Sequence, residues 1–166
     1  MTQKIVPWPD KRLRMPAEPV VEITEGVQAI WNEMIDVMEA MPGVGLAACQ
    51  LGITQRLAVV DASEKRGQVI RMANPEILHA SAEFRAHTEA SPNLPGVSAE
   101  ISRPRAVTVR YLNEKAELEE RDFVGLWATS VQHQIDHLNG KMYFDHLSKV
   151  KRQMLLNKAA KMARRL

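Results

Sequence analysis

Two histidines four positions apart, His133 and His137, carry the clearest chemical signal in this sequence. On a helix this spacing places both imidazoles on one face, where they can bind one metal ion. In the HExxH pattern of metalloproteases a glutamate follows the first histidine and acts as general base on the metal-bound water. Here that position is Gln134, whose amide has nearly the shape of a carboxylate but takes up no proton at neutral pH. The stretch predicts a site that keeps its outline and loses its acid–base chemistry.

Three helices are predicted to position or flank this site. The histidines lie in a predicted helix from Leu126 to Leu138, which ends at Asn139-Gly140, a good C-terminal stop. A helix from about Thr24 to Met41 is indicated by an apolar stripe and by Thr24 as its cap. A basic helix is predicted from Leu147 to Leu166. The stripe of the first helix consists of Val27, Ile30, Met34, Met38 and Met41, and that of the basic helix of Leu147, Val150, Met154, Leu155 and Met162.

Strands are predicted between these helices. The predicted strands are Leu57–Asp61, two segments between Val69 and Glu89 that separate at Asn74-Pro75, and a hairpin of Ala106–Leu112 and Ala116–Val124 that turns at Asn113-Glu114-Lys115. Residues 1–20, with four prolines, predict an extended, turn-rich arm, and Ser91–Gly96 a proline-rich loop. Strands mixed with segregated helices indicate an α+β fold, which we expect to form one domain over residues 1–166.

Composition favours a cytoplasmic globular protein. Of 166 residues, 45% are hydrophobic and 25% charged, without an apolar run of 18 residues or a signal-peptide-like start. The single cysteine, Cys49, has no internal disulfide partner. The net charge of +2 hides an asymmetry, because residues 149–166 carry seven basic side chains and no acidic one. The other 148 residues hold 15 basic and 20 acidic groups, so the body is acidic and the tail basic.

Three segments together resemble the motifs of peptide deformylases. Gly43–Gln50 (GVGLAACQ) is similar to the GxGLAAxQ motif, and Glu89–Gly96 (EASPNLPG) takes the place of EGCLSxPG. Gln132–Gly140 (QHQIDHLNG) matches QHExDHLxG except at the glutamate, and Pro9–Arg14 is similar to an N-terminal PDxRLR. The resemblance covers nearly the whole chain and implies the peptide deformylase-like fold, with mixed antiparallel sheets around the HxxxH helix.

The resemblance also implies an activity and its machinery. Peptide deformylases remove the formyl group from N-terminal formyl-methionine of new proteins, using Fe²⁺ or Zn²⁺ held by one cysteine and two histidines. The metal ligands would fall on Ser91, His133 and His137, and the general base on Gln134. The two oxyanion donors of the family, a glutamine side chain and a backbone N–H, would fall on Gln50 and on Pro92.

Three of these positions depart from the family pattern. Ser91 offers a hydroxyl, a poor and normally protonated ligand, in place of a thiolate. Gln134 orients water but shuttles no proton, and Pro92 has no backbone N–H. We therefore expect deformylase activity to be absent or very low, with Fe²⁺ or Zn²⁺ bound at reduced affinity or not at all.

Several alternatives stay open at this point. The protein could bind N-formylmethionyl peptides without cleaving them, in a pocket lined in part by Val44, Gly45, Leu126 and Ile135. It could also be an active metallohydrolase with altered metal ligation that removes the formyl group from nascent polypeptides, or a structural relic acting through its surface. The basic C-terminal helix could dock on the ribosome, as in some deformylases, or be a solvated face. We expect no membrane and no DNA partner.

Two other interpretations of single motifs are weaker. Cys49 beside Gln50 could be a catalytic thiol with His133 as its base, although a small buried filler fits the residue better. The glycines of residues 43–50 could form a phosphate loop, but the segment lacks the lysine and the strand–loop–helix context of such loops.

Overall fold

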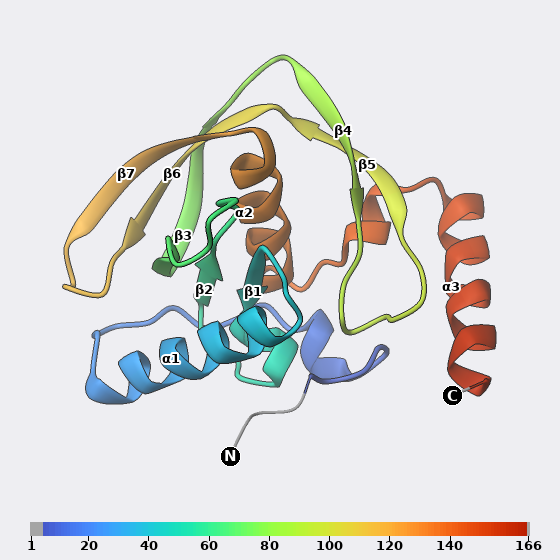
Figure 1. Cartoon of the computed structure of the whole chain (residues 1–166), viewed down its shortest axis with the longest axis horizontal. Coiled ribbons are helices and arrows are strands. Elements are labelled where there is room, and N and C mark those ends of the chain that lie inside the picture. Colours follow the sequence, from blue (N-terminus) through green and yellow to red (C-terminus); the bar gives the residue numbers. More distant parts are fainter. Residues whose placement is uncertain (1–4, 166) are drawn as a thin grey trace.

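In the computed structural model, which describes residues 5–165, a five-stranded antiparallel sheet and a two-stranded sheet surround one central helix. Figure 1 shows this helix, α2, inside an arch of strands, with α1 crossing below it and α3 standing at the far end. The sheets have the strand orders β1-β2-β3-β6-β7 and β4-β5. The elements are α1 (Glu25–Ala40), β1 (Gly45–Ala47), β2 (Leu57–Val60), β3 (Ile70–Ala80), β4 (Phe84–Glu89), β5 (Ala99–Pro104), β6 (Ala106–Leu112), β7 (Leu118–Val124), α2 (Gly125–Leu138) and α3 (Lys149–Arg164). The predicted α+β fold is confirmed.

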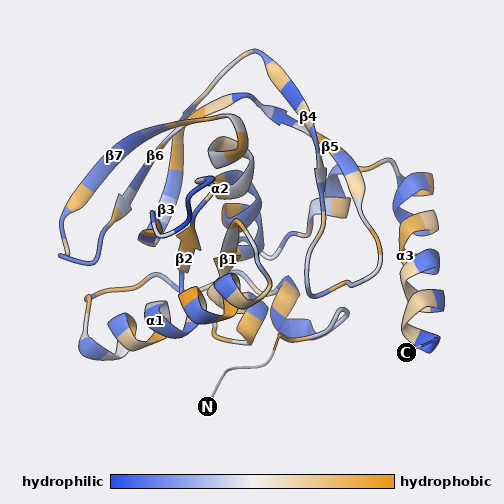
Figure 2. Ribbon diagram, viewed as in Figure 1, coloured by the Kyte–Doolittle hydropathy of each residue, from blue (hydrophilic) through white to orange (hydrophobic). Residues whose placement is uncertain are grey.

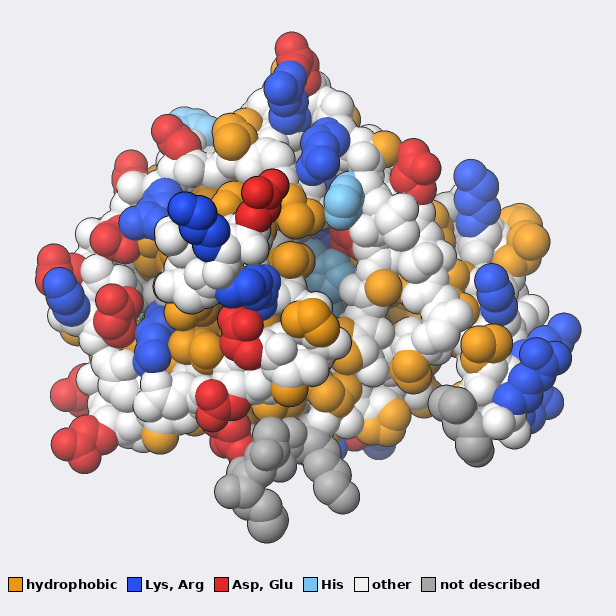
Figure 3. Space-filling view, viewed as in Figure 1, with side chains coloured by type: hydrophobic (Ala, Val, Ile, Leu, Met, Phe, Trp, Pro, Cys, Tyr) orange, Lys and Arg blue, Asp and Glu red, His pale blue; other side chains and the backbone are white. Residues whose placement is uncertain are grey.

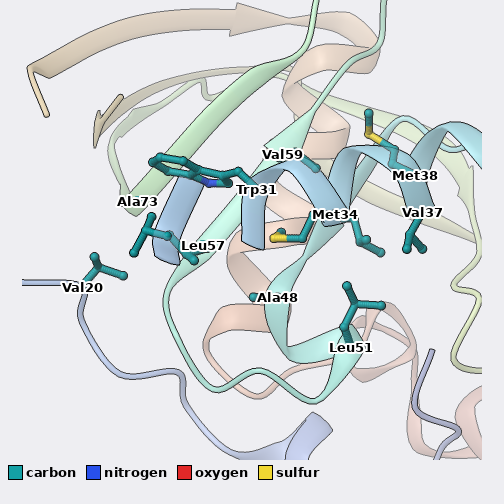
Figure 4. Close-up of a cluster of buried hydrophobic side chains, with 12 residues drawn as sticks. Val20, Trp31, Met34, Val37, Met38, Ala48, Leu51, Leu57, Val59 and Ala73 are labelled. Atoms are coloured by element: carbon teal, nitrogen blue, oxygen red, sulfur yellow. The ribbon is translucent and has the colours of Figure 1, made fainter. Parts of the chain in front are cut away.

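Helix α1 follows the predicted boundaries closely. The Thr24 side chain accepts a hydrogen bond of 3.2 Å from the backbone N–H of Val27, which satisfies one of the free donors at the helix start. The apolar side of α1 packs on β2 and β3 in the cluster drawn in Figure 4. Trp31, fully buried, donates from its indole nitrogen to the carbonyl of Met72 on β3 at 3.2 Å. This bond and the apolar cluster fix α1 under the sheet.

The strands differ from the prediction in three places. The Asn74-Pro75 pair does not divide two strands, because β3 runs through it with a shift of register against β6. Asn74 has φ +53°, and its side chain bonds both backbone polar groups of Val20, so a bulge accommodates the proline. The short β1 and the charged β5 have no counterpart in the prediction. Residues 11–14 of the expected extended arm form a 3-10 helix, and residues 1–4 lie outside the described part.

Helix α2 is buried along nearly its whole length. Ten of its residues are buried, because the five-stranded sheet covers one side and the segment from β4 to β5 approaches another. Figure 2 shows that β2, which lies beside α2, is hydrophobic, whereas β7 at the sheet edge is largely hydrophilic. The helix ends at Asn139, as predicted, and Gly140 follows with φ +78°. A side chain at Gly140 would meet the carbonyl oxygen of Arg14 at 2.5 Å, so this close approach requires glycine.

Helix α3 packs on the body through part of the predicted apolar stripe. Leu155, a member of that stripe, and Ala159 are buried in a cluster with Leu94, Val97 and Phe144, and Leu147 packs against it. Two other members of the stripe, Val150 and Met154, are 70% and 65% exposed. Leu155 and Ala159 therefore lie on the side of α3 that packs on the body, whereas Val150 and Met154 form a second apolar strip that faces solvent. No helix of the described residues is long and apolar enough to cross a membrane.

Candidate functional site

A cavity of about 520 Å³ opens where the loop before β1, the loop after β4 and helix α2 meet. Figure 3 shows the hollow near the centre of this face, with histidine side chains in it. Of the residues predicted for the site, seven line this cavity: Val44, Gly45, Gln50, Ser91, Leu126, His133 and Gln134. Segments far apart in the sequence thus converge as the motifs indicate.

The side chains of His133 and His137, both on α2, face each other. Their Nε2 atoms lie 3.1 Å apart, and His133 points its Nδ1 to Glu89 at 2.8 Å. The ionised Glu89 accepts a hydrogen bond from that Nδ1, so the free lone pair of a neutral His133 ring is on Nε2, directed at His137. Burial lowers the pKa of His137 well below its ordinary value, and the charge of a protonated His133 would lower it further. His137 is therefore neutral, and its Nδ1 is buried without a hydrogen-bond partner among the described residues.

Buried charges behind the histidines hold His133 in place. Arg103 on β5 donates to both oxygens of Glu89 at 2.7 and 2.9 Å and to Asp136 at 2.8 Å. Asp136 in turn lies 2.7 Å from the Nε2 of His146. Burial favours the neutral form of Glu89, but the hydrogen bonds from His133 and Arg103 outweigh it and hold the pKa of Glu89 below its usual value. The carboxylate that orients His133 is therefore ionised at neutral pH.

A second hydrogen-bond set joins Gln50, Ser91 and Asn93, all buried. The Nε2 of Gln50 donates to Asn93 Oδ1 at 2.7 Å and to Ser91 Oγ at 3.3 Å, while the Ser91 hydroxyl donates to Asn93 Oδ1 at 2.9 Å. Gln50 was predicted to donate to a substrate oxyanion, but both of its side-chain hydrogens have acceptors inside the protein. Asn93 was missed, although it stands where the resembled motif has serine.

Gln134 reaches the cavity from α2 beside β1. Its Oε1 is buried without a hydrogen-bond partner in the described part of the chain. A side chain at Gly45 would lie 2.6 Å from Gln134 Nε2 and 2.5 Å from Ser130 Oγ, so glycine there allows β1 to pass close to α2. Pro92 also lines the cavity, and its ring is exposed.

The prediction for Ile135 needs revision, and the catalytic alternative for Cys49 is not supported. Ile135 does not line the cavity, because it lies on the side of α2 that packs against Val60, Val109 and Phe123 of the sheet. Cys49 does not face His133, because its Sγ donates to the carbonyl of His137 at 3.2 Å within a small apolar cluster. Burial raises the pKa of Cys49 to about 12, so the thiol stays protonated, as expected of a structural filler.

The residues at the predicted metal site fit a metal only in part. Two imidazole nitrogens converge, since the Nε2 atoms of His133 and His137 lie 3.1 Å apart. The third position does not fit, because the Ser91 hydroxyl is protonated and donates to Asn93. Among the described residues, no group of three histidine, cysteine or acidic side chains could hold a metal ion. A tightly held catalytic metal therefore lacks one of its protein ligands.

The sequence signals for the missed residues were faint. Glu89 served only to align the motif, and nothing in the sequence paired it with Arg103, 14 residues away on a strand that was not predicted. Asp136 lies inside the histidine motif, and its bonds to Arg103 and His146 place it in the support of the histidines.

Comparison with known proteins gives consistent results. The model of the family described as Polypeptide deformylase matches residues 2–153. A protein of Afipia carboxidovorans named peptide deformylase is 40% identical over 164 residues, covering 98% of this chain and 96% of the relative. The crystal structure of a peptide deformylase from Legionella pneumophila superposes with a TM-score of 0.92 at 38% identity, covering 99% of this chain and 96% of that one. A peptide deformylase from Ehrlichia chaffeensis in complex with actinonin gives 0.91 at 32% identity, covering 97% of each.

Proposed function

The chain belongs to the peptide deformylase family, and from this premise we propose that its cavity binds N-formylmethionyl peptides but removes the formyl group slowly at most. The observation that carries the proposal is the pairing of an open cavity of about 520 Å³ with Gln134, Ser91 and Pro92 at its reactive end. The family normally works with Fe²⁺ or Zn²⁺. We propose that this chain holds either ion at reduced affinity.

Three side chains support slow hydrolysis, each for a different reason. Without a proton-accepting group at Gln134, roughly 10²–10⁴-fold in rate is lost. Without a backbone N–H at Pro92, the developing oxyanion loses a donor that contributes roughly 10²–10³-fold. The Ser91 hydroxyl keeps its proton and donates a hydrogen bond to Asn93, so it is a poor ligand. These losses are not simply additive, but each is sufficient to impair turnover.

The apolar part of the cavity supports retained binding. Met41, Val44, Val97 and Leu126 line it, and its volume exceeds that of a methionine side chain. Glycine at position 45 keeps β1 close to α2, so the floor of the cavity is not filled. A formyl-methionyl N-terminus can therefore place its thioether chain on an apolar wall even where the chemistry is weak.

Calorimetric titration of chelator-treated protein with formyl-Met-Ala tests the binding. We expect a Kd of roughly 1 mM or below, because enzymes in general have KM values of about 1 μM to 1 mM. Formyl-Ala-Ala is the matched control, because it lacks only the side chain that fills the apolar wall, and it should bind at least tenfold more weakly. Equal affinity for the two peptides, or no binding of either, would refute the proposal.

Weak metal-dependent deformylation is the second candidate. It is favoured by the name of the relatives that are 40% identical over nearly the whole chain and by the two facing imidazoles. Formate release after anaerobic loading with Fe²⁺ or Zn²⁺ separates it from binding alone. A purely structural role, by contrast, predicts neither binding nor formate release.

Helix α3 supports a further proposal about partners. Its basic side chains face solvent beside the exposed Val150 and Met154, and Figure 3 shows them gathered at one edge of the molecule. A basic helix of this kind suits ribosomal RNA, where phosphates supply affinity. We therefore propose that α3 brings the cavity to nascent chains at the ribosome.

A further inference from the structure

The side-chain amide of Asn93 has an orientation fixed by its neighbours. Its Nδ2 donates to the carbonyl oxygens of Val6 at 2.6 Å and Gln50 at 3.2 Å. Its Oδ1 accepts from Gln50 Nε2 and from the Ser91 hydroxyl. Turning the amide over would set nitrogen against two donors and oxygen against two carbonyls, so only one orientation satisfies all four contacts.

The side chain of Gln50 is equally determined. Its Oε1 accepts from the backbone N–H of Ala47 at 2.9 Å, which directs Nε2 toward Asn93 and Ser91. Gln50 lines the cavity but is only 1% exposed. Asn93 is not among the lining residues and lies behind them. The shorter bond of Gln50, at 2.7 Å, thus directs one of its two hydrogens at Asn93, behind the cavity wall, while the other is directed at Ser91 at 3.3 Å.

We propose that Asn93 is a specificity-determining residue that withholds the Gln50 amide from ligands. A peptide carbonyl entering the cavity then meets neither the side-chain hydrogens of Gln50 nor a backbone N–H at Pro92. This rests on the proposed function, because it specifies how the same cavity contacts a formyl-methionyl peptide. The ligand's formyl oxygen contributes little to affinity, and the apolar wall contributes most.

Hydrogen exchange of the Gln50 side chain in the free, full-length protein tests, without any ligand, whether Asn93 keeps the Gln50 amide hydrogens from other acceptors. Asn93→Ser removes the acceptor, and the two Gln50 side-chain hydrogens should then exchange with water at least tenfold faster by NMR. Asn113→Ser is the matched control, because Asn113 is also a buried asparagine but bonds only within the turn between β6 and β7, so exchange at Gln50 should stay slow. Equal exchange in wild type and Asn93→Ser would overturn the proposal, even if neither protein binds a peptide.

Titration with formyl-Met-Ala extends the test to recognition. Asn93→Ser should bind roughly three- to tenfold more tightly than wild type, the value of one released hydrogen bond. Gln50→Met in the Asn93→Ser background should abolish that gain. An affinity of Asn93→Ser equal to that of wild type, although its Gln50 hydrogens exchange faster, would overturn the proposal. Binding by Asn93→Ser alone would support it and refute the proposed function of the natural chain.

Discussion

Arg103 donates two hydrogen bonds, of 2.7 and 2.9 Å, to the carboxylate of Glu89, and both side chains are almost fully buried. Glu89 in turn orients His133, so this ion pair positions the face of α2 that lines the cavity. Two charges buried in this way are stabilising only as a pair, because each alone would lose its hydration without compensation. The support of the histidine site thus depends on a strand that carries no recognisable motif.

Arg103→Met should therefore lower the free energy of unfolding by about 3–5 kcal/mol, because it leaves Glu89 and Asp136 without their cation. Urea denaturation followed by circular dichroism measures the change. Arg105→Met is the matched control two residues along, since its pair with Glu83 is 63% and 77% exposed and should contribute about 0–1 kcal/mol. Equal losses of unfolding free energy in the two variants would mean that the buried ion pair stabilises the protein no more than the exposed one.

Stability should also fall with acid because of His137. Its ordinary pKa is 6.5, and burial holds the folded value well below that. Below pH 6.5 the unfolded chain takes up a proton here that the folded chain refuses, so the free energy of unfolding decreases as pH falls. The slope from this group approaches about 1.4 kcal/mol per pH unit and ends once the folded ring is protonated.

Denaturation between pH 7 and 5 in the presence of chelator measures that slope. The window lies above the range in which Glu89 and Asp136, whose pKa values are lowered by their hydrogen bonds, begin to protonate. His137→Asn should flatten the curve in this window. An unchanged slope in the variant would place the acid sensitivity elsewhere.

Metal affinity should rise when the third ligand is restored. Ser91→Cys supplies a thiolate beside the two imidazoles, and the gain in Zn²⁺ affinity should exceed the roughly 10–100-fold that outer-shell changes produce. Competition with a colorimetric chelator measures it. The comparison is made in a Cys49→Ser background, so that the new thiol is the only one. Wild-type affinity equal to that of Ser91→Cys would show that another ligand completes the site.

The elements foreseen from the sequence are those with a strong local period. The stripe through Val27, Met34 and Met38 and the cap at Thr24 define α1 without tertiary information. Strand β5 was not predicted because Glu100, Arg103 and Pro104 do not form a strand pattern. The strand is stabilised by the pairing of Arg103 with Glu89 on β4, which the local sequence does not reveal. Asn74-Pro75 gave a wrong prediction for the opposite reason. The pair is a strong local turn signal, but in the structure it forms a bulge within β3 that is held by hydrogen bonds to Val20.

The candidate site divides in the same way. Motif spacing predicted that His133, His137, Gln50 and Ser91 would be brought together. In the structure His133, Gln50 and Ser91 line one cavity, and the Nε2 of His137, which does not line it, lies 3.1 Å from that of His133. Ile135 was misplaced because α2 is covered on nearly all sides, so apolar character does not tell which side lines the cavity. The role of Asn93 depends on a bond between residues 43 positions apart, which no local pattern contains.

Ribosome association through α3 should depend on salt and on charge. Lys158→Glu with Lys161→Glu reverses two exposed charges while leaving the buried Leu155 and Ala159 in place. For each RNA phosphate that α3 no longer neutralises, the slope of log affinity against log salt should become shallower by about 0.7–0.9. Co-sedimentation with ribosomes over a salt series measures this, with Lys65→Glu in a distant loop as control. Identical slopes in all three proteins would leave α3 as a solvated helix.

Formate release from formyl-Met-Ala, by protein loaded anaerobically with Fe²⁺ and separately with Zn²⁺, tests the central claim most directly. The combined variant Ser91→Cys, Pro92→Leu and Gln134→Glu runs beside the natural protein. We predict formate release by the variant at least 10²-fold faster than by the natural chain, because the change at Gln134 alone accounts for that much. Rates within tenfold of each other, with the natural chain clearly active, would contradict the account and show that another base and another ligand do the chemistry.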